Sequence, residues 1–130
     1  MKRGISLAQE RGQALTEFAL VLPLLVTIVF AIVQLGITFN HYVTLTDAVR
    51  AGARQAAVSR LSGDPAQAAK QAVYGAANDL DPDELHVDVA SGWDPGADVT
   101  VSATYPYSLT IFGLVFKSGW LTSSTTERVE

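Results

Sequence analysis

The sequence has no cysteine and only two histidines among its 130 residues. The missing cysteines exclude a disulfide framework, thiolate metal sites and a cysteine nucleophile. His41 and His86 stand in no metalloprotease or serine hydrolase motif, and no glycine-rich loop suggests a phosphate site. We therefore expect both histidines to face solvent. We also expect no enzymatic activity, no bound metal and no cofactor.

Basic side chains are scarce after the first twelve residues. Lys2, Arg3 and Arg11 outnumber Glu10 at the beginning of the chain, whereas the remainder is acidic and the whole chain has a formal net charge of -4. Binding to nucleic acid requires a clustered basic face, which this distribution does not provide. We therefore expect no nucleic-acid partner.

Charge is absent altogether from residues 18–39 (FALVLPLLVTIVFAIVQLGITF). At about 1.5 Å per residue they form a helix of roughly 33 Å, which is long enough to span a bilayer. A buried helix of a soluble protein is the alternative. A cleaved secretory signal fits less well, because the run is long for a signal and no A-x-A-like site follows it. The basic residues before the run predict a single-pass protein of the cytoplasmic membrane, with a cytoplasmic N-terminus and an extracytoplasmic remainder.

Helical spacing continues beyond the apolar run, so the sequence predicts one transmembrane and stalk helix over residues 13–61. Arg50 and Arg54 share a face of its last part with Asp47. These charges form either a solvated face or a helix-pairing surface for another subunit. A separate stripe contains Tyr42, Leu45, Val49, Ala53, Ala56 and Ala57.

Residues 62–65 (SGDP) are predicted to end this helix and to start a second one. Asp64 at the N-cap and Pro65 at the first helical position suit a helix N-terminus, where backbone N–H groups lack partners. The second helix is expected to reach about Asn78. Its buried stripe is predicted to contain Ala69, Val73, Ala76 and Leu80, with Tyr74 at the margin.

The acidic segment 78–84 (NDLDPDE) begins with the alternating aspartates of a calcium-binding loop. The match then fails, because Glu84 stands where that loop needs glycine and Ala90 where it needs a bidentate glutamate. We interpret the segment as a solvated turn that holds no metal.

The last third of the chain has the periodicity of strands. Residues 85–89 and 99–105 alternate apolar and polar side chains, and residues 121–129 are predicted to form a weaker closing strand after a turn at 117–119. Residues 109–116 (LTIFGLVF) are either a core strand or an apolar patch that awaits a partner. The predicted fold class is α+β: a long N-terminal helix, a second helix and a small antiparallel sheet of about three strands.

Gly12 precedes Glu17 by five positions, between a basic leader and an apolar run. This arrangement resembles the processing site of type IV prepilins. More closely, residues 11–25 (RGQALTEFALVLPLL) and 46–57 (TDAVRAGARQAA) together resemble the TadE-like family of minor pilins or pseudopilins. Those proteins belong to the tight-adherence (Tad/Flp) pilus systems of bacteria.

The resemblance implies that a prepilin peptidase cuts between Gly12 and Gln13 on the cytoplasmic side of the membrane, close to the assembly residues Glu17 and Phe18. It further implies that Glu17 pairs with the N-terminal amine of a neighbouring pilin or pseudopilin subunit. Without such a partner, Glu17 would be an interfacial residue that reaches towards the lipid headgroups.

These expectations divide the chain into a basic leader removed by cleavage (1–12), the transmembrane and stalk helix (13–61) and an extracytoplasmic α+β domain (62–130). The implied function is that of a minor pilin or pseudopilin in the assembly of an adhesive pilus, present in the membrane and, after processing, at the cell surface or in the pilus. The alternative function is a permanently anchored binding module that uses the acidic turn or residues 109–116 to hold a ligand or partner.

Overall fold

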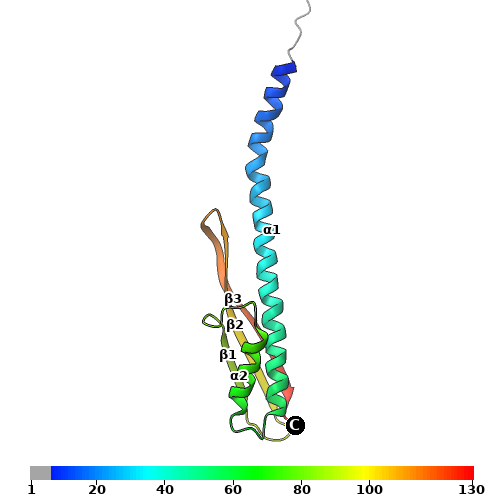
Figure 1. Cartoon of the computed structure of the whole chain (residues 1–130), viewed down its shortest axis with the longest axis vertical. Helices are drawn as coiled ribbons and strands as arrows, with labels where there is room; N and C mark the ends of the chain where they lie inside the picture. Colours follow the sequence, from blue (N-terminus) through cyan, green and yellow to red (C-terminus); the bar gives the residue numbers. More distant parts are fainter. Residues whose placement is uncertain (1–6) are drawn as a thin grey trace, which may run out of the picture.

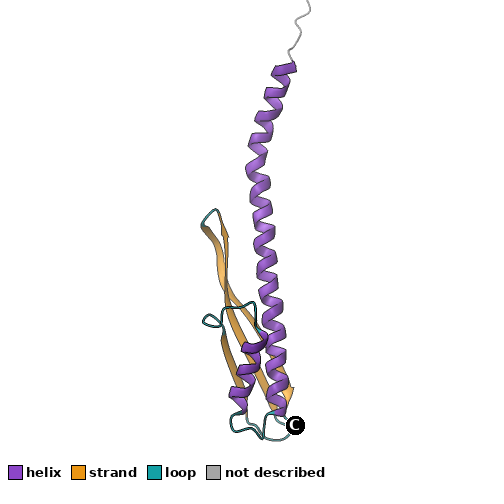
Figure 2. Ribbon diagram, in the orientation of Figure 1, coloured by secondary structure: helices purple, strands orange, loops and turns teal. Residues whose placement is uncertain are grey.

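The computed structural model describes residues 7–130, with side chains from Arg11 onward. Lys2 and Arg3 of the predicted leader lie outside the described residues. Figures 1 and 2 show one long helix that extends beyond a small domain of a second helix and a sheet. This confirms the predicted α+β class. The elements are α1 (Leu7–Val58), α2 (Pro65–Ala76), β1 (His86–Ser91), β2 (Asp98–Ile111) and β3 (Leu114–Arg128).

α1 is one continuous helix of 52 residues, about 78 Å long at about 1.5 Å per residue. It begins at Leu7, so that Gly12 lies inside the helix, and it ends at Val58 rather than at Leu61. A single glycine costs a helix only about 1 kcal/mol relative to alanine, which good helix formers around it can offset. Pro23 also lies inside α1 without ending it.

The two halves of α1 differ in burial. No side chain between Arg11 and Asn40 is buried, whereas the last part of α1 buries one face against α2 and the sheet. Five of the six predicted stripe residues are buried there, whereas Tyr42 is exposed and borders a groove. The buried apolar residues contributed by α1 are Leu45, Ala48, Val49, Ala53, Ala56 and Ala57.

α2 begins as the sequence predicts. The backbone N–H of Gln67 donates to Asp64 Oδ1 over 2.9 Å, and Pro65 occupies the first turn. Ala69 and Val73 are buried as predicted, whereas Ala76 is only partly buried and Leu80 reaches the core from the loop after the helix. α2 lies so close to α1 that a Cβ added at Gly52 would clash with Val73 Cγ2 and lie 3.1 Å from the Ala69 carbonyl oxygen.

The sheet has the order β1-β2-β3, and both strand pairs are antiparallel. One face of β2 is buried in the core, while the opposite face stays partly exposed and carries hydroxyls such as Thr100, whose Oγ1 lies 2.8 Å from Thr126 Oγ1. The alternation predicted for residues 99–105 is therefore confirmed. The sheet's contribution to the core is Val99, Val101, Ala103 and Tyr105.

The β2–β3 hairpin is longer than the sequence indicates. The predicted turn at residues 117–119 is wrong, because these residues lie inside β3, and the chain reverses instead at Phe112-Gly113. Pro106 does not interrupt β2, because β1 ends its pairing at Thr104 and leaves that side of β2 as an edge where proline is tolerated. Residues 109–116 thus form the far end of the hairpin rather than a core strand.

Candidate processing and assembly site

The predicted processing segment, residues 12–18, lies on α1 far from the domain and is exposed throughout. Helical spacing places Gln13 and Glu17 one turn apart, and Gln13 Nε2 donates to Glu17 Oε1 over 3.0 Å. Thr16 Oγ1 donates to the carbonyl oxygen of Gly12 over 3.0 Å. The segment thus presents one glycine peptide and one carboxylate on adjacent turns of an open helix.

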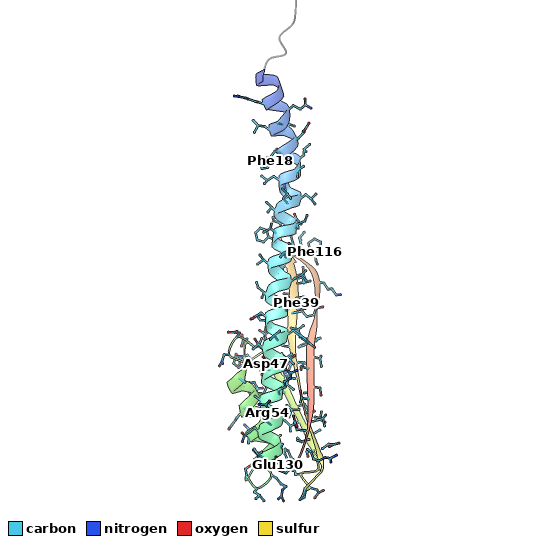
Figure 3. All side chains as sticks on the ribbon, turned by 90° about the vertical axis from the view of Figure 1, so that its right-hand side faces the viewer. Phe18, Phe39, Asp47, Arg54, Phe116 and Glu130 are labelled. Atoms are coloured by element: carbon cyan, nitrogen blue, oxygen red, sulfur yellow. The ribbon has the colours of Figure 1, made fainter. Side chains whose placement is uncertain are left out.

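Glu17 has no cationic partner within salt-bridge distance among the residues whose side chains are described. It lies next to Phe18, the first residue of the charge-free run, which is exposed on the helix surface (Figure 3). A carboxylate at the edge of hydrocarbon is costly unless a positive group or polar surroundings compensate it. Among the residues whose side chains are described, only the amide of Gln13 contacts the Glu17 carboxylate.

The second predicted assembly surface lies on the part of α1 that adjoins the domain. Asp47, Arg50 and Arg54 are exposed, and Figure 3 shows Asp47 and Arg54 along this part of the helix. Arg50 Nη1 lies 3.4 Å from Asp47 Oδ1, a pair so exposed that it contributes little to stability. The structure does not bring these charges together with Glu17, which lies about eight to ten helical turns away.

His41 and His86 line different pockets, and Glu84 of the acidic turn borders the pocket that His41 lines. His41 is not solvent-facing as predicted but partly buried, with its ring edge-on to Tyr105 at a centroid distance of 5.5 Å. His86 is exposed and lies 6.0 Å from the Trp120 ring. In the acidic turn, Asp81 Oδ1 accepts from the backbone N–H of Asp83. No group of three potential metal ligands occurs within residues 7–130.

A contact that the sequence does not predict joins the hairpin to the apolar part of α1. Gln34 forms two hydrogen bonds with the backbone of Thr110, and the rings of Phe30 and Phe112 lie 5.9 Å apart. On the domain side of this contact, a groove of about 320 Å³ lies between α1 and the hairpin. The available signal was Gln34 itself, one of the few polar side chains in the charge-free run.

Among the described residues, α1 is the helix that is long and apolar enough to cross a membrane, and its most apolar stretch is not buried against the domain. The core helix of a soluble protein would bury such a stretch. The exposure of this stretch therefore fits a single-pass membrane anchor.

The comparisons with known proteins agree with this geometry. No curated protein and no solved structure matches the chain. One protein family does match, and its residues lie wholly within α1, from the glycine of the candidate processing site to Arg54 of the exposed charged face. Residues 12–54 match the family described as TadE-like protein, the family that the sequence resembles.

Proposed function

We propose that this chain is a minor pilin or pseudopilin-like subunit for the assembly of a tight-adherence pilus and that a prepilin peptidase removes its leader. The family match over residues 12–54 supports a component associated with that pilus. The observation that carries the finer proposal is the exposed segment from Gly12 to Phe18, where a glycine and an exposed carboxylate directly precede a charge-free span.

In this proposal the basic leader stays in the cytoplasm, α1 crosses the membrane, and the α+β domain lies outside. Arg11 and the other basic residues before the apolar run favour that orientation. The peptidase would then meet the Gly12–Gln13 peptide at the cytoplasmic surface. The chain itself performs no catalysis in this role.

Cleavage requires the Gly12 carbonyl to become accessible to the peptidase. That carbonyl oxygen lies within α1 and accepts a hydrogen bond from Thr16 Oγ1, so the first turns of the helix must open locally. Ends of helices open at low free-energy cost, and glycine lowers the helix stability further by about 1 kcal/mol. Gly12 therefore suits the position both because it lacks a side chain and because it weakens the helix.

After cleavage Gln13 would carry a new α-amine, and Glu17 would be the fifth residue of the mature helix. A carboxylate in the first turns of a helix is stabilised by the positive end of the helix dipole. The Glu17 carboxylate, which accepts a hydrogen bond from Gln13, would pair with the α-amine of a neighbouring subunit. Arg50 and Arg54 would provide a second, weaker contact between packed helices outside the membrane.

The assembly role is tested by replacing Glu17 in a piliated strain. We expect Glu17→Ala and Glu17→Gln to reduce pilus number strongly while the amount of chain in the membrane stays unchanged, because the lost property is the negative charge. Glu127→Ala removes another exposed carboxylate, from β3, and serves as the matched control, for which we expect normal piliation. Normal piliation of both Glu17 variants would contradict the proposed pairing, and loss of piliation in Glu127→Ala would show that the assay does not isolate it.

A further inference from the structure

The end of the β2–β3 hairpin presents apolar side chains to its surroundings. Residues 110–116 contain no charge, and Phe112 and Phe116 are each 69% exposed. Leu114 and Val115 between them are also exposed. Hairpins of soluble proteins protect such ends with charged or polar residues, so an end of this composition indicates a nonaqueous environment.

This hairpin end lies beside the membrane-spanning part of α1. Figure 1 shows the hairpin extending past the domain along α1, and Figure 3 shows Phe116 next to the part of the helix between Phe18 and Phe39. The Phe112 ring lies 5.9 Å from the Phe30 ring. Phe30 precedes Phe39, the end of the charge-free run, by about 13 Å of helix. A bilayer crossed by α1 over this run therefore contains the hairpin end at the depth of its hydrocarbon.

Gln34 satisfies the backbone of one hairpin residue, Thr110, at that depth. Its Nε2 donates to the Thr110 carbonyl oxygen over 2.6 Å, and the Thr110 N–H donates to its Oε1 over 3.0 Å. The β2–β3 register shifts between Leu109 and Thr110, where strand pairing is irregular. An unpaired backbone group in hydrocarbon costs several kcal/mol, whereas in water it would bond to solvent. The two hydrogen bonds from Gln34 are thus most valuable if this strand edge lies in lipid.

The turn at the hairpin end also indicates a nonaqueous environment. Phe112 and Gly113 have φ values of 51° and 80°, as in a type I′ turn. Asparagine is preferred at the first of these positions, and a bulky residue there costs about 1 to 2 kcal/mol. A phenylalanine in such a position indicates that contacts of its apolar side chain offset the backbone strain.

On the domain side of the hairpin end, the residues are of the types that occupy a membrane interface. Lys117 is the first charged residue after the apolar end, and it borders the groove together with Tyr42 and Tyr107. Long basic and aromatic side chains are the residues that occupy the boundary between hydrocarbon and headgroups. The remaining groove residues, Leu35, Thr38, Phe39, Leu109 and Leu121, offer an almost wholly apolar lining.

The last residues of the hairpin end, 111–116, are called the hairpin tip. We infer that this tip inserts into the membrane leaflet on the side of the domain and is a second lipid-embedded element next to α1. Its partner is lipid hydrocarbon rather than another protein, because the tip shares its depth with the lipid-exposed part of the same chain. The inference depends on α1 crossing the membrane. It requires neither cleavage at Gly12 nor assembly into a pilus, so it can fail or succeed independently of the proposed function.

The test uses the full chain in phosphatidylcholine vesicles. Because the chain has no cysteine, a single introduced cysteine can be labelled uniquely with the environment-sensitive fluorophore NBD. Phe112→Cys and Phe116→Cys place the label at the tip, and Asp94→Cys places it on an exposed loop at the other end of β2 as the matched control. Labels at the tip should show blue-shifted emission, quenching by chain-labelled doxyl lipid and several-fold weaker quenching by aqueous iodide than the control.

Two further arms separate the alternatives. At about one chain per vesicle the tip labels should stay protected from iodide; loss of protection on dilution would mean that a neighbouring chain covers the tip, and would overturn the inference. Gln34→Leu, which removes both hydrogen bonds to Thr110 outside the core, should reduce doxyl quenching at the tip without changing the control label. Equal iodide quenching of the tip and control labels in the otherwise unchanged chain would also overturn the inference.

Discussion

Both halves of α1 are helical, but their side chains have different surroundings. Residues 18–39 carry large apolar side chains that the domain leaves exposed, as in Leu20, which is 76% exposed. The second half, up to Val58, uses smaller side chains and buries them, with Leu45 and Ala48 fully inaccessible. Helix propensity alone does not distinguish the two halves. The difference shows that a continuous helix can pack one part within the chain and leave the other part exposed.

The largest expected effect comes from the same substitution in the two halves. Leu45→Ala should lower the free energy of unfolding of the domain by about 2 to 5 kcal/mol, because it leaves a cavity at a fully buried position. Leu20→Ala should leave that free energy unchanged. Denaturation of the detergent-solubilised chains, followed by the near-UV signal of the tryptophans, measures both. Equal destabilisation by the two variants would contradict the separation of the halves.

A charge in each half tests the membrane assignment. Val29→Arg places a cation near the centre of the charge-free run and should disfavour membrane insertion by about 3 kcal/mol. Val58→Arg adds the same charge at an exposed position at the other end of α1 and should insert normally. Carbonate extraction of membranes compares the inserted fractions. Full insertion of the Val29 variant would argue against a spanning helix.

Glycine substitutions give a smaller effect whose direction differs between the halves. Gly52→Ala should destabilise the domain by about 1 to 3 kcal/mol, because its Cβ would clash with Val73 and overpack the α1–α2 contact. At Gly36 an added Cβ has no neighbour within 4 Å, so Gly36→Ala should be neutral or stabilise the helix by up to about 1 kcal/mol. Protease resistance of the two variants, read against the parent chain, reveals whether the directions differ.

The smallest effect concerns the start of α2. Asp64→Ala removes the side-chain acceptor of the Gln67 N–H and should lower the unfolding free energy by about 1 kcal/mol. Asp79→Ala changes an exposed aspartate in the turn after the other end of α2 and should stay within about 0.5 kcal/mol of the parent. Denaturant titrations of both variants and the parent measure these differences. Identical midpoints for Asp64→Ala and the parent would show that the N-cap hydrogen bond does not stabilise the fold.

Those parts of the fold that depend on local chemistry could be predicted from the sequence. Asp64-Pro65 marks a helix start whatever surrounds it, and the alternation over residues 99–105 reveals which face of a strand is buried. The candidate site could be found because Gly12 and Glu17 are close in sequence and flank a long apolar run.

The remaining features depend on contacts between distant residues. Lys117-Ser118-Gly119 has a typical turn composition, yet Gly119 lies opposite Tyr107 within the hairpin, with its position set by strand pairing. Phe112 is an atypical residue for a turn with positive φ, so local preference indicated the wrong position. The Gln34–Thr110 contact joins residues that are 76 positions apart, which no periodicity reveals.

We have proposed that α1 becomes an assembly helix after its leader is removed, and the first residue of the mature chain decides whether this removal occurs. Mass spectrometry of the chain from cells with an active prepilin peptidase should find Gln13 as the first residue, and cells without the peptidase should contain the uncleaved form. Gly12→Leu should block cleavage, whereas Gly36→Leu, at the other glycine of α1 with free space around its Cβ, should not. A chain that still begins at Met1 in the presence of active peptidase would contradict the account and favour a permanently anchored binding module.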